Sequence, residues 1–221
     1  LFPEDLSRYL NEYYRKQGVE VLSGSKVTGL EAHGPAMTVK IEGPAGQTSA
    51  QDHDGVVAGI GIVPNVDLAR QAGLDIDDGI VVGEDLRTSA GDIYAAGDAA
   101  SFFNPALGKR MRVEHEDNAN TMGRHAGRSM AGDAQPYRHL PFFYSDLFDL
   151  GYEAVGDLDS RLETFADWQE PLFKGVVYYL GEGRVRGILL WNVWDQVEHA
   201  RKLIAEPGPF SPGDLKGRFP A

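Results

Sequence analysis

The sequence lacks cysteine altogether among its 221 residues. A disulfide, a CxxC redox pair, a cysteine zinc cluster and a cysteine nucleophile are therefore all excluded. Zinc-binding helices also need two histidines at short spacing, and no HExxH pattern occurs. The sequence predicts no metal site, and any redox chemistry would have to come from a bound cofactor.

Basic residues are scarce as well. Twenty-one Lys and Arg face 33 Asp and Glu, which gives a formal net charge of −12. This balance argues against nucleic acid as a partner, because the phosphate backbone is bound through Lys and Arg. Two explanations remain open, namely attraction of a basic protein partner and simple solubility.

Long apolar runs are missing too, so no membrane span is expected. Glu4, Asp5 and Arg8 interrupt the N-terminus in a way that a signal peptide would not tolerate. We therefore expect a cytoplasmic protein with no membrane partner.

The pattern along the chain changes near residue 141. Before it, we expect three helices, at 3–17, 65–72 and 118–131. We also expect strands at 19–22, 26–31, 37–42, 79–83 and 92–96, and a buried strand at 55–58. Residues 132–141 are expected to be a linker. After it, strands at 152–158, 162–167, 173–180 and 185–191 indicate an antiparallel sheet, followed by a helix at 193–204 and an irregular tail from Pro207.

The segment that carries most chemical information runs from Thr88 to Asp98, in the order Thr-Ser-Ala-Gly-Asp-Ile-Tyr-Ala-Ala-Gly-Asp. Gly97 and Asp98 follow an apolar run, and ligands of open α/β sheets bind beyond the carboxyl ends of strands. Gly97 permits close approach of a ligand, and the Asp98 carboxylate accepts hydrogen bonds from hydroxyl groups. An ordinary Gly-Asp turn is the alternative.

This segment resembles the second FAD-binding motif of the FAD-dependent pyridine nucleotide-disulfide oxidoreductases. The stretch from Val57 to Asn65 is similar to the segment that leads from the NAD domain back to the FAD domain in that family. Arg112 to Ala119 and the glycines that follow resemble the branch that contains apoptosis-inducing factor-like and rubredoxin or ferredoxin reductase-like flavoproteins. Three further segments resemble that branch in order and at plausible spacing: 145–156, 174–176 and 187–202.

The resemblance implies a set of cofactor-binding residues but no catalytic acid or base. Asp98, with Gly97 before it, would bind the ribityl chain of FAD, and Tyr144 would lie beside the flavin and the nicotinamide. Glu114, His115 and Glu116 would lie at the start of the helix that meets the flavin. Gly61 and Glu153 would lie near the nicotinamide of NAD.

Each of these residues also has a plain structural explanation. His115 could be a capped surface histidine, Tyr144 a core residue like the Phe142 and Phe143 before it, and Glu153 a solvated strand residue. His33, His53, His139 and His199 are most simply surface residues. In the family an aromatic at the position of Tyr144 is usually tryptophan, so the stacking geometry could differ here.

The largest departure from the family is the absence of its two GxGxxG fingerprints. The nearest match, Gly59 to Pro64, has proline in place of the third glycine. Helix N-termini at such fingerprints bind the pyrophosphates, so this chain alone should bind either dinucleotide poorly. Because the chain also opens on Leu1 rather than methionine, and its first segment is already a helix, we expect that it is the C-terminal portion of a longer enzyme.

The expected fold is therefore α/β: the remainder of two Rossmann-like dinucleotide-binding domains, at 1–61 and 62–141, followed by an α+β C-terminal domain with an antiparallel sheet at 142–221. The expected function is that of an FAD-dependent NAD(P)H oxidoreductase, with FAD and NAD(P) as cofactors and a small electron-carrier protein, a quinone or oxygen as acceptor. The alternatives are a cofactor-free interaction module and one half of a split flavoenzyme. Homodimerisation is a further expectation.

Overall fold

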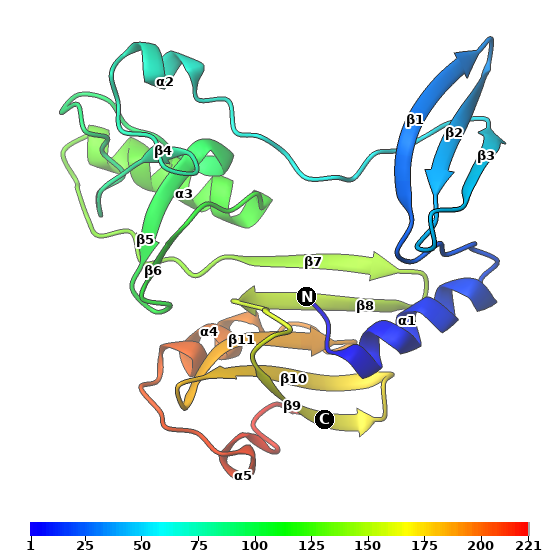
Figure 1. Ribbon diagram of the computed structural model, residues 1–221. Coiled ribbons are helices and arrows are strands. Elements are labelled where there is room, and N and C mark those ends of the chain that lie inside the picture. Colours follow the sequence, from blue (N-terminus) through cyan, green and yellow to red (C-terminus); the bar gives the residue numbers. More distant parts are fainter. Residues whose placement is uncertain (221) are drawn as a thin grey trace. The chain divides into compact units, whose positions relative to one another are not determined.

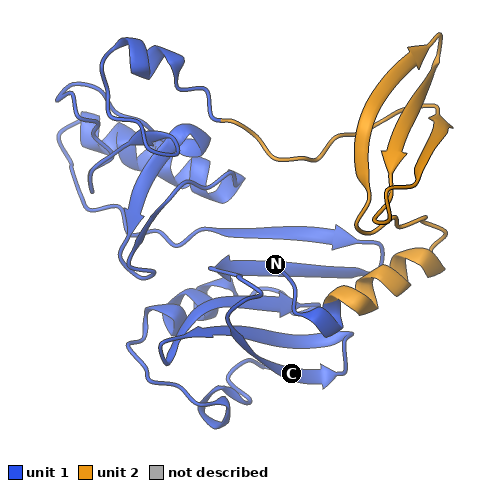
Figure 2. Cartoon of the chain, viewed as in Figure 1, with its two compact units in different colours: residues 1–6, 64–221 blue, residues 7–63 orange. Residues whose placement is uncertain are grey.

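The computed structural model describes residues 1–220, and the chain divides into two compact units (Figures 1 and 2). One unit comprises residues 7–63, and the other comprises residues 1–6 and 64–221, of which 221 lies outside the described part. The three-domain division expected from the sequence stays a prediction, and its last residue is not described.

The smaller unit holds most of helix α1 (Glu4–Lys16) and a three-stranded antiparallel sheet. Acidic residues open α1 and basic residues close it, which suits the helix dipole, and Gly18 ends the helix at φ +85°. The sheet has the order β1-β2-β3, with β1 (Lys26–His33), β2 (Ala36–Glu42) and β3 (Thr48–His53). The expected helix and two of the strands are confirmed, whereas residues 19–22 form no strand and β3 was not expected.

The expected buried strand at 55–58 is wrong. Residues 54–63 form no regular secondary structure and are exposed, with Val57 at 98% and Ile60 at 92% exposure. Within residues 1–220 no strand pairs with this apolar run. An apolar run becomes a buried strand only where neighbouring strands supply hydrogen-bond partners on either side.

The larger unit begins with an α/β part in which helix α3 (Glu116–Met130) packs beside a small sheet (Figure 1). Strand β4 (Ile80–Val81) runs parallel to β5 (Ala100–Asn104), which pairs antiparallel with β6 (Lys109–Met111). Helix α2 (Asp67–Gln71) precedes this sheet, where the sequence predicted a helix at 65–72, and no side chain caps its start. The apolar contacts include Phe102 and Met122, both almost fully buried.

The expected strand at 92–96 is also wrong. It reduces to one isolated bridge between Arg87 and Tyr94, and the chain then bends through the short 3-10 helix η1 (Gly97–Ala99) into β5. The expected linker at 132–141 is not loose either. Its residues Tyr137 and Leu140 are only 4% and 5% exposed, because they fill space in two apolar cores.

The second part of this unit is a five-stranded antiparallel sheet of order β7-β8-β11-β10-β9. Its strands are β7 (Phe142–Leu147), β8 (Leu150–Gly156), β9 (Glu163–Glu170), β10 (Lys174–Gly181) and β11 (Arg184–Trp191). Helix α4 (Val197–Ala205) packs on β8 and β11, where Ile188 and Ile204 are fully buried. The tail was expected to be irregular, yet it forms α5 (Pro212–Leu215) and buries Leu215 in the same core.

The expected fold class is confirmed. The described chain combines mixed α/β structure with antiparallel sheets and carries only part of a Rossmann-like architecture.

Candidate functional site

A pocket of about 500 Å³ opens where α3 begins, between the residues that precede the helix and the start of β7. Four of the residues predicted from the resemblance line it: Glu114, His115, Glu116 and Tyr144. Residues far apart in the sequence therefore meet at one concave surface. This pocket is the candidate cofactor site.

The N-terminus of α3 supplies hydrogen-bond donors to this site. The first helical bond runs from the Ala119 N–H to the His115 carbonyl at 2.9 Å, so the three N–H groups before it have no partner within the helix. His115 occupies the cap position in extended conformation, and its side chain forms no cap. The open donors and the helix dipole together favour a ligand that carries or develops negative charge.

His115 is half-buried and stacks on Phe143, with ring centroids 4.5 Å apart and planes at 13°. Burial lowers the pKa of His115, although the nearby carboxylates of Glu114, Asp98 and Asp117 act in the opposite direction. The imidazole is therefore neutral at pH 7. The alternative of a capped surface histidine does not describe this environment.

Arg112 fixes the segment that precedes the helix, a role that the sequence did not reveal. Its side chain, only 10% exposed, donates to the Glu114 carboxylate at 2.8 Å, to the Asp78 carboxylate at 3.1 Å and to the Asp98 carbonyl at 3.2 Å. The hydrogen bond to Glu114 is the main cause that raises the pKa of Arg112. One guanidinium thus holds Glu114 and the bend at Asp98 together.

The bend at Gly97 and Asp98 packs directly against α3. Gly97 has φ +76°, and a Cβ there would lie 3.5 Å from the Ala119 side chain. Its N–H points at the Met122 sulfur at 3.2 Å. The Asp98 side chain is exposed and close enough to His115 for their charges to interact. The structure therefore brings Asp98 to the start of α3.

Tyr144 and Glu153 are directly opposite each other on β7 and β8. Tyr144 is 61% exposed, so it is not the core residue of the alternative explanation. Burial raises the pKa of Glu153, and the charge of Asp195 raises it further, whereas hydrogen bonds from two backbone N–H groups lower it. One Glu153 oxygen is buried without a hydrogen-bond partner among the described residues. Glu153 is thus more enclosed than a solvated strand residue.

Gly61 is the one predicted site residue outside the larger unit. It belongs to the smaller unit, lies in the exposed segment at φ +87°, and has open space where a Cβ would stand. The binding roles given to all eight predicted residues stay predictions.

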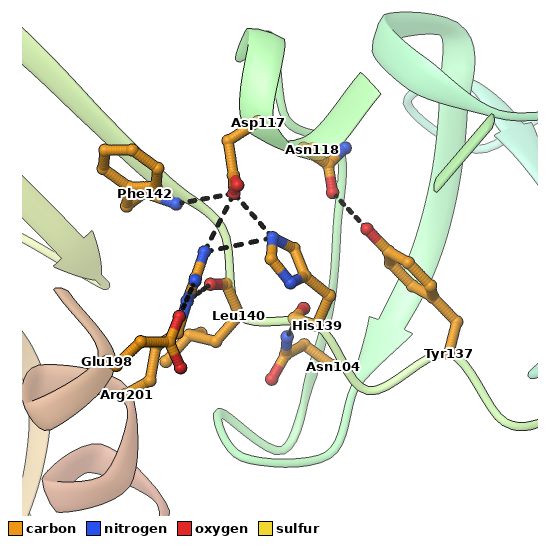
Figure 3. A network of polar contacts seen from close by, with 9 residues as sticks. All are labelled: Asn104, Asp117, Asn118, Tyr137, His139, Leu140, Phe142, Glu198 and Arg201. Carbon is orange, nitrogen blue, oxygen red and sulfur yellow. Dashed lines mark hydrogen bonds and ion pairs between the residues drawn. The ribbon is translucent and has the colours of Figure 1, made fainter. Parts of the chain in front are cut away.

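One further residue of the pocket and its hydrogen-bond partner were not predicted from the sequence. Asp117 lines the pocket and bonds to His139 at 2.5 Å (Figure 3). His139, expected at the surface, has a side chain only 18% exposed. Their separation of 22 residues leaves no local sequence signal for the pair.

Within residues 1–220, no cluster of three or more His, Asp or Glu side chains is arranged to hold a metal ion. No helix in the same part of the chain is long and apolar enough to cross a membrane.

Comparison with known proteins decides the family. The model for "Pyridine nucleotide-disulphide oxidoreductase" matches residues 1–123, more than half of the chain. The chain belongs to the pyridine nucleotide-disulphide oxidoreductase family. A second model, for the C-terminal region of mitochondrion-associated apoptosis-inducing factor, matches residues 126–172 and 167–206. Both the resemblance and the branch inferred from the sequence are confirmed.

The relatives agree with this assignment. Apoptosis-inducing factor 1 of Dictyostelium discoideum is 37% identical, across 92% of this chain and 41% of its own length. Putidaredoxin reductase CamA of Pseudomonas putida is 29% identical, across 95% and 50%. A ferredoxin reductase from Rhodopseudomonas palustris superposes with a TM-score of 0.83 at 28% identity, across 96% and 52%.

The chain therefore spans about half, or less, of the length of these oxidoreductases. Members of the family are FAD-dependent and use NAD(P)H, in agreement with the cofactors expected from the sequence.

Proposed function

We propose that this chain forms the flavin-facing and C-terminal portion of an FAD-dependent NAD(P)H oxidoreductase. The observation that carries the proposal is the start of α3, where uncapped N–H groups and the neutral, stacked His115 open into one pocket. Family membership supports it independently.

The residues present fit the flavin and ribityl end of FAD. The exposed Asp98 carboxylate accepts hydrogen bonds from ribityl hydroxyls, while Gly97 keeps the backbone close to α3. The first-turn N–H groups would face the flavin ring, and Tyr144 and Phe143 also line the pocket. These groups satisfy polar edges and cover apolar faces, as an aromatic ring with a polar rim requires.

When bound, FAD supplies the redox chemistry, accepting hydride from NAD(P)H and passing electrons on to an acceptor. This chain's own residues position the ring and set its electrostatic surroundings. The α3 dipole favours negative charge at its N-terminus. Because His115 is neutral, it contributes hydrogen-bonding capacity and stacking surface without a fixed charge.

For the acceptor we propose a small electron-carrier protein. Support comes from relatives named as the ferredoxin reductase component of a dioxygenase system and as putidaredoxin reductase, and from a similar structure solved as a covalent complex with putidaredoxin. A quinone or oxygen is the competing acceptor, and NADH and NADPH are both tested as donors.

The experiment is anaerobic mixing of the FAD-saturated enzyme, with the dinucleotide-binding segments supplied on the same or a second chain, with NADH or NADPH while flavin absorbance is recorded. We expect bleaching with one donor and faster reoxidation by a ferredoxin-type carrier than by a quinone or oxygen. His115→Ala should slow bleaching at least several-fold, whereas His33→Ala is the matched control because its side chain is 63% exposed. A flavin-loaded protein that neither donor bleaches would overturn the proposal, and failure to bind FAD at all would favour the cofactor-free module or the split enzyme.

A further inference from the structure

The first turn of α3 is tied to a different part of the fold through Asp117 (Figure 3). Its carboxylate accepts hydrogen bonds from His139 Nε2 at 2.5 Å, from Arg201 Nη2 at 3.0 Å and from the Phe142 N–H at 3.3 Å. The Asp117 side chain is 19% exposed. Two cationic or potentially cationic groups thus meet one largely buried carboxylate.

Arg201 links this carboxylate to α4. Its side chain is 17% exposed, and its Nε donates to the Leu140 carbonyl at 2.7 Å. Its Nη1 pairs with Glu198, which is 75% exposed, and its guanidinium lies 5.5 Å from the centre of the Phe142 ring. Arg201 therefore reaches Asp117 from a helix 84 residues further along the chain.

The next residue of α3 is held by the same chain segment that carries His139. Asn118 is fully buried, and its Oδ1 accepts a hydrogen bond from the Tyr137 hydroxyl at 3.0 Å. Burial raises the pKa of Tyr137, so the hydroxyl stays protonated and donates. Consecutive residues of the helix's first turn are thus fixed by the segment that leads into β7.

The charge on Asp117 matters because of its location. An anion in the first turn is favourable for the helix itself, but it opposes a second negative charge at the same end. Burial would raise the pKa of Asp117, yet the hydrogen bond and charge of His139 and the charge of Arg201 outweigh it and lower the pKa. Asp117 is therefore ionised at neutral pH, and its charge is compensated locally.

We propose that Arg201 is a positioning residue that neutralises Asp117, to which His139 is also hydrogen-bonded, so that the open end of α3 stays electropositive toward the flavin. The inference deepens the proposed function and rests on it. It assigns to the α4 arginine, through Asp117, control over the reduction potential of the bound cofactor.

If Asp117 and Arg201 act through their charges, their variants should shift the flavin reduction potential differently than if they only hold the fold together. Asp117→Asn removes a negative charge and leaves Arg201 in place, so reduction of the flavin should become more favourable. Arg201→Gln leaves the Asp117 charge uncompensated, so reduction should become less favourable. The double substitution removes both charges and should return the potential close to the original value. Loss of a structural tie would shift both single variants in the same direction.

The test is the reduction potential of FAD bound to the saturated protein, measured anaerobically against a reference dye. For each single variant we expect a change of about fivefold in the equilibrium constant for flavin reduction, the effect of one partly buried charge in a helix's first turn. For a two-electron couple this corresponds to about 20 mV. Glu198→Gln is the matched control, since it removes the exposed partner of Arg201 but not Asp117, and should change the constant less than about twofold.

Arg201→Lys keeps the positive charge and should restore the potential toward the original, even where Arg201→Gln folds poorly. Shifts of the same sign in both single variants, or none in either, would overturn the inference while leaving the proposed function intact. An unsubstituted protein that binds no FAD would instead overturn the proposed function, and this inference with it.

Discussion

Gly79 is a residue whose replacement should disturb the site from outside the pocket. It has φ +112°, and a Cβ at this position would lie 2.7 Å from the Ala99 carbonyl oxygen and 2.9 Å from Arg112 Cδ. Real Cβ atoms do not approach backbone oxygen this closely, so Gly79→Ala must move the backbone or Arg112. Arg112 is the brace that joins Glu114 to the bend at Asp98.

The cost has two parts. An L-residue at positive φ costs roughly 1–2 kcal/mol. Overpacking against a fixed neighbour typically adds about 1–3 kcal/mol. Gly79→Ala should therefore lower the free energy of unfolding by roughly 2–5 kcal/mol.

Gly73 provides the matched control. It also has positive φ, at +72°, and it lies in the same unit, but nothing stands within 4 Å of its Cβ position. Gly73→Ala should cost only the conformational part, about 1–2 kcal/mol. Urea denaturation of both variants with linear extrapolation measures the difference. Equal losses in the two variants would refute the argument that Gly79 makes room for Arg112.

Three further outcomes follow from burial and charge. Because the pKa of Asp117 is lowered in the folded state, its contribution to stability is present above pH ~4 and is lost as pH falls through the folded pKa. In Asp117→Asn, the free energy of unfolding should therefore depend less on pH below pH ~4, as measured by acid titration with circular dichroism. Ile188→Ala, at a fully buried position, should lower the free energy of unfolding in urea by about 2–5 kcal/mol. Val57→Ala, 98% exposed, should change it by less than about 0.5 kcal/mol in the same assay, and a large loss would mean that this segment is buried after all.

Local signals in the sequence predicted the regular elements well. Small and apolar residues at helical spacing predicted a helix at 118–131, and α3 runs from Glu116 to Met130. The strands around Gly181-Glu182-Gly183 were predicted because a tight turn separates two apolar runs, and β10 and β11 pair there.

Elements that depend on distant partners could not be predicted in this way. The apolar run at 55–58 resembles a buried strand, but burial depends on neighbours that a local pattern does not contain. The run at 92–96 bends instead of pairing, and β5 forms just after it. Leu215 and Phe219 are buried in a segment whose proline and glycine content indicated an irregular surface tail.

The same distinction holds for the site. Glu114, His115, Glu116 and Tyr144 were identified by resemblance, and they line one pocket. The groups that hold this pocket in place come from afar: Arg112 acts on Asp78, 34 residues away, and Arg201 acts on Asp117, 84 residues away. Such pairs follow from the tertiary fold, and no periodicity or motif marks them.

The most direct test of the central claim is a titration of the ¹⁵N-labelled chain with FAD, observed through backbone amide shifts. This measurement detects weak binding, which matters because no dinucleotide fingerprint occurs in the sequence. The account predicts that saturable shifts concentrate at Gly97, Asp98 and the first-turn amides of Glu116 and Asp117, while the distant Gly217 stays unchanged. Shifts confined to other surfaces, or none at millimolar FAD with the chain folded, would contradict a flavin site at the start of α3.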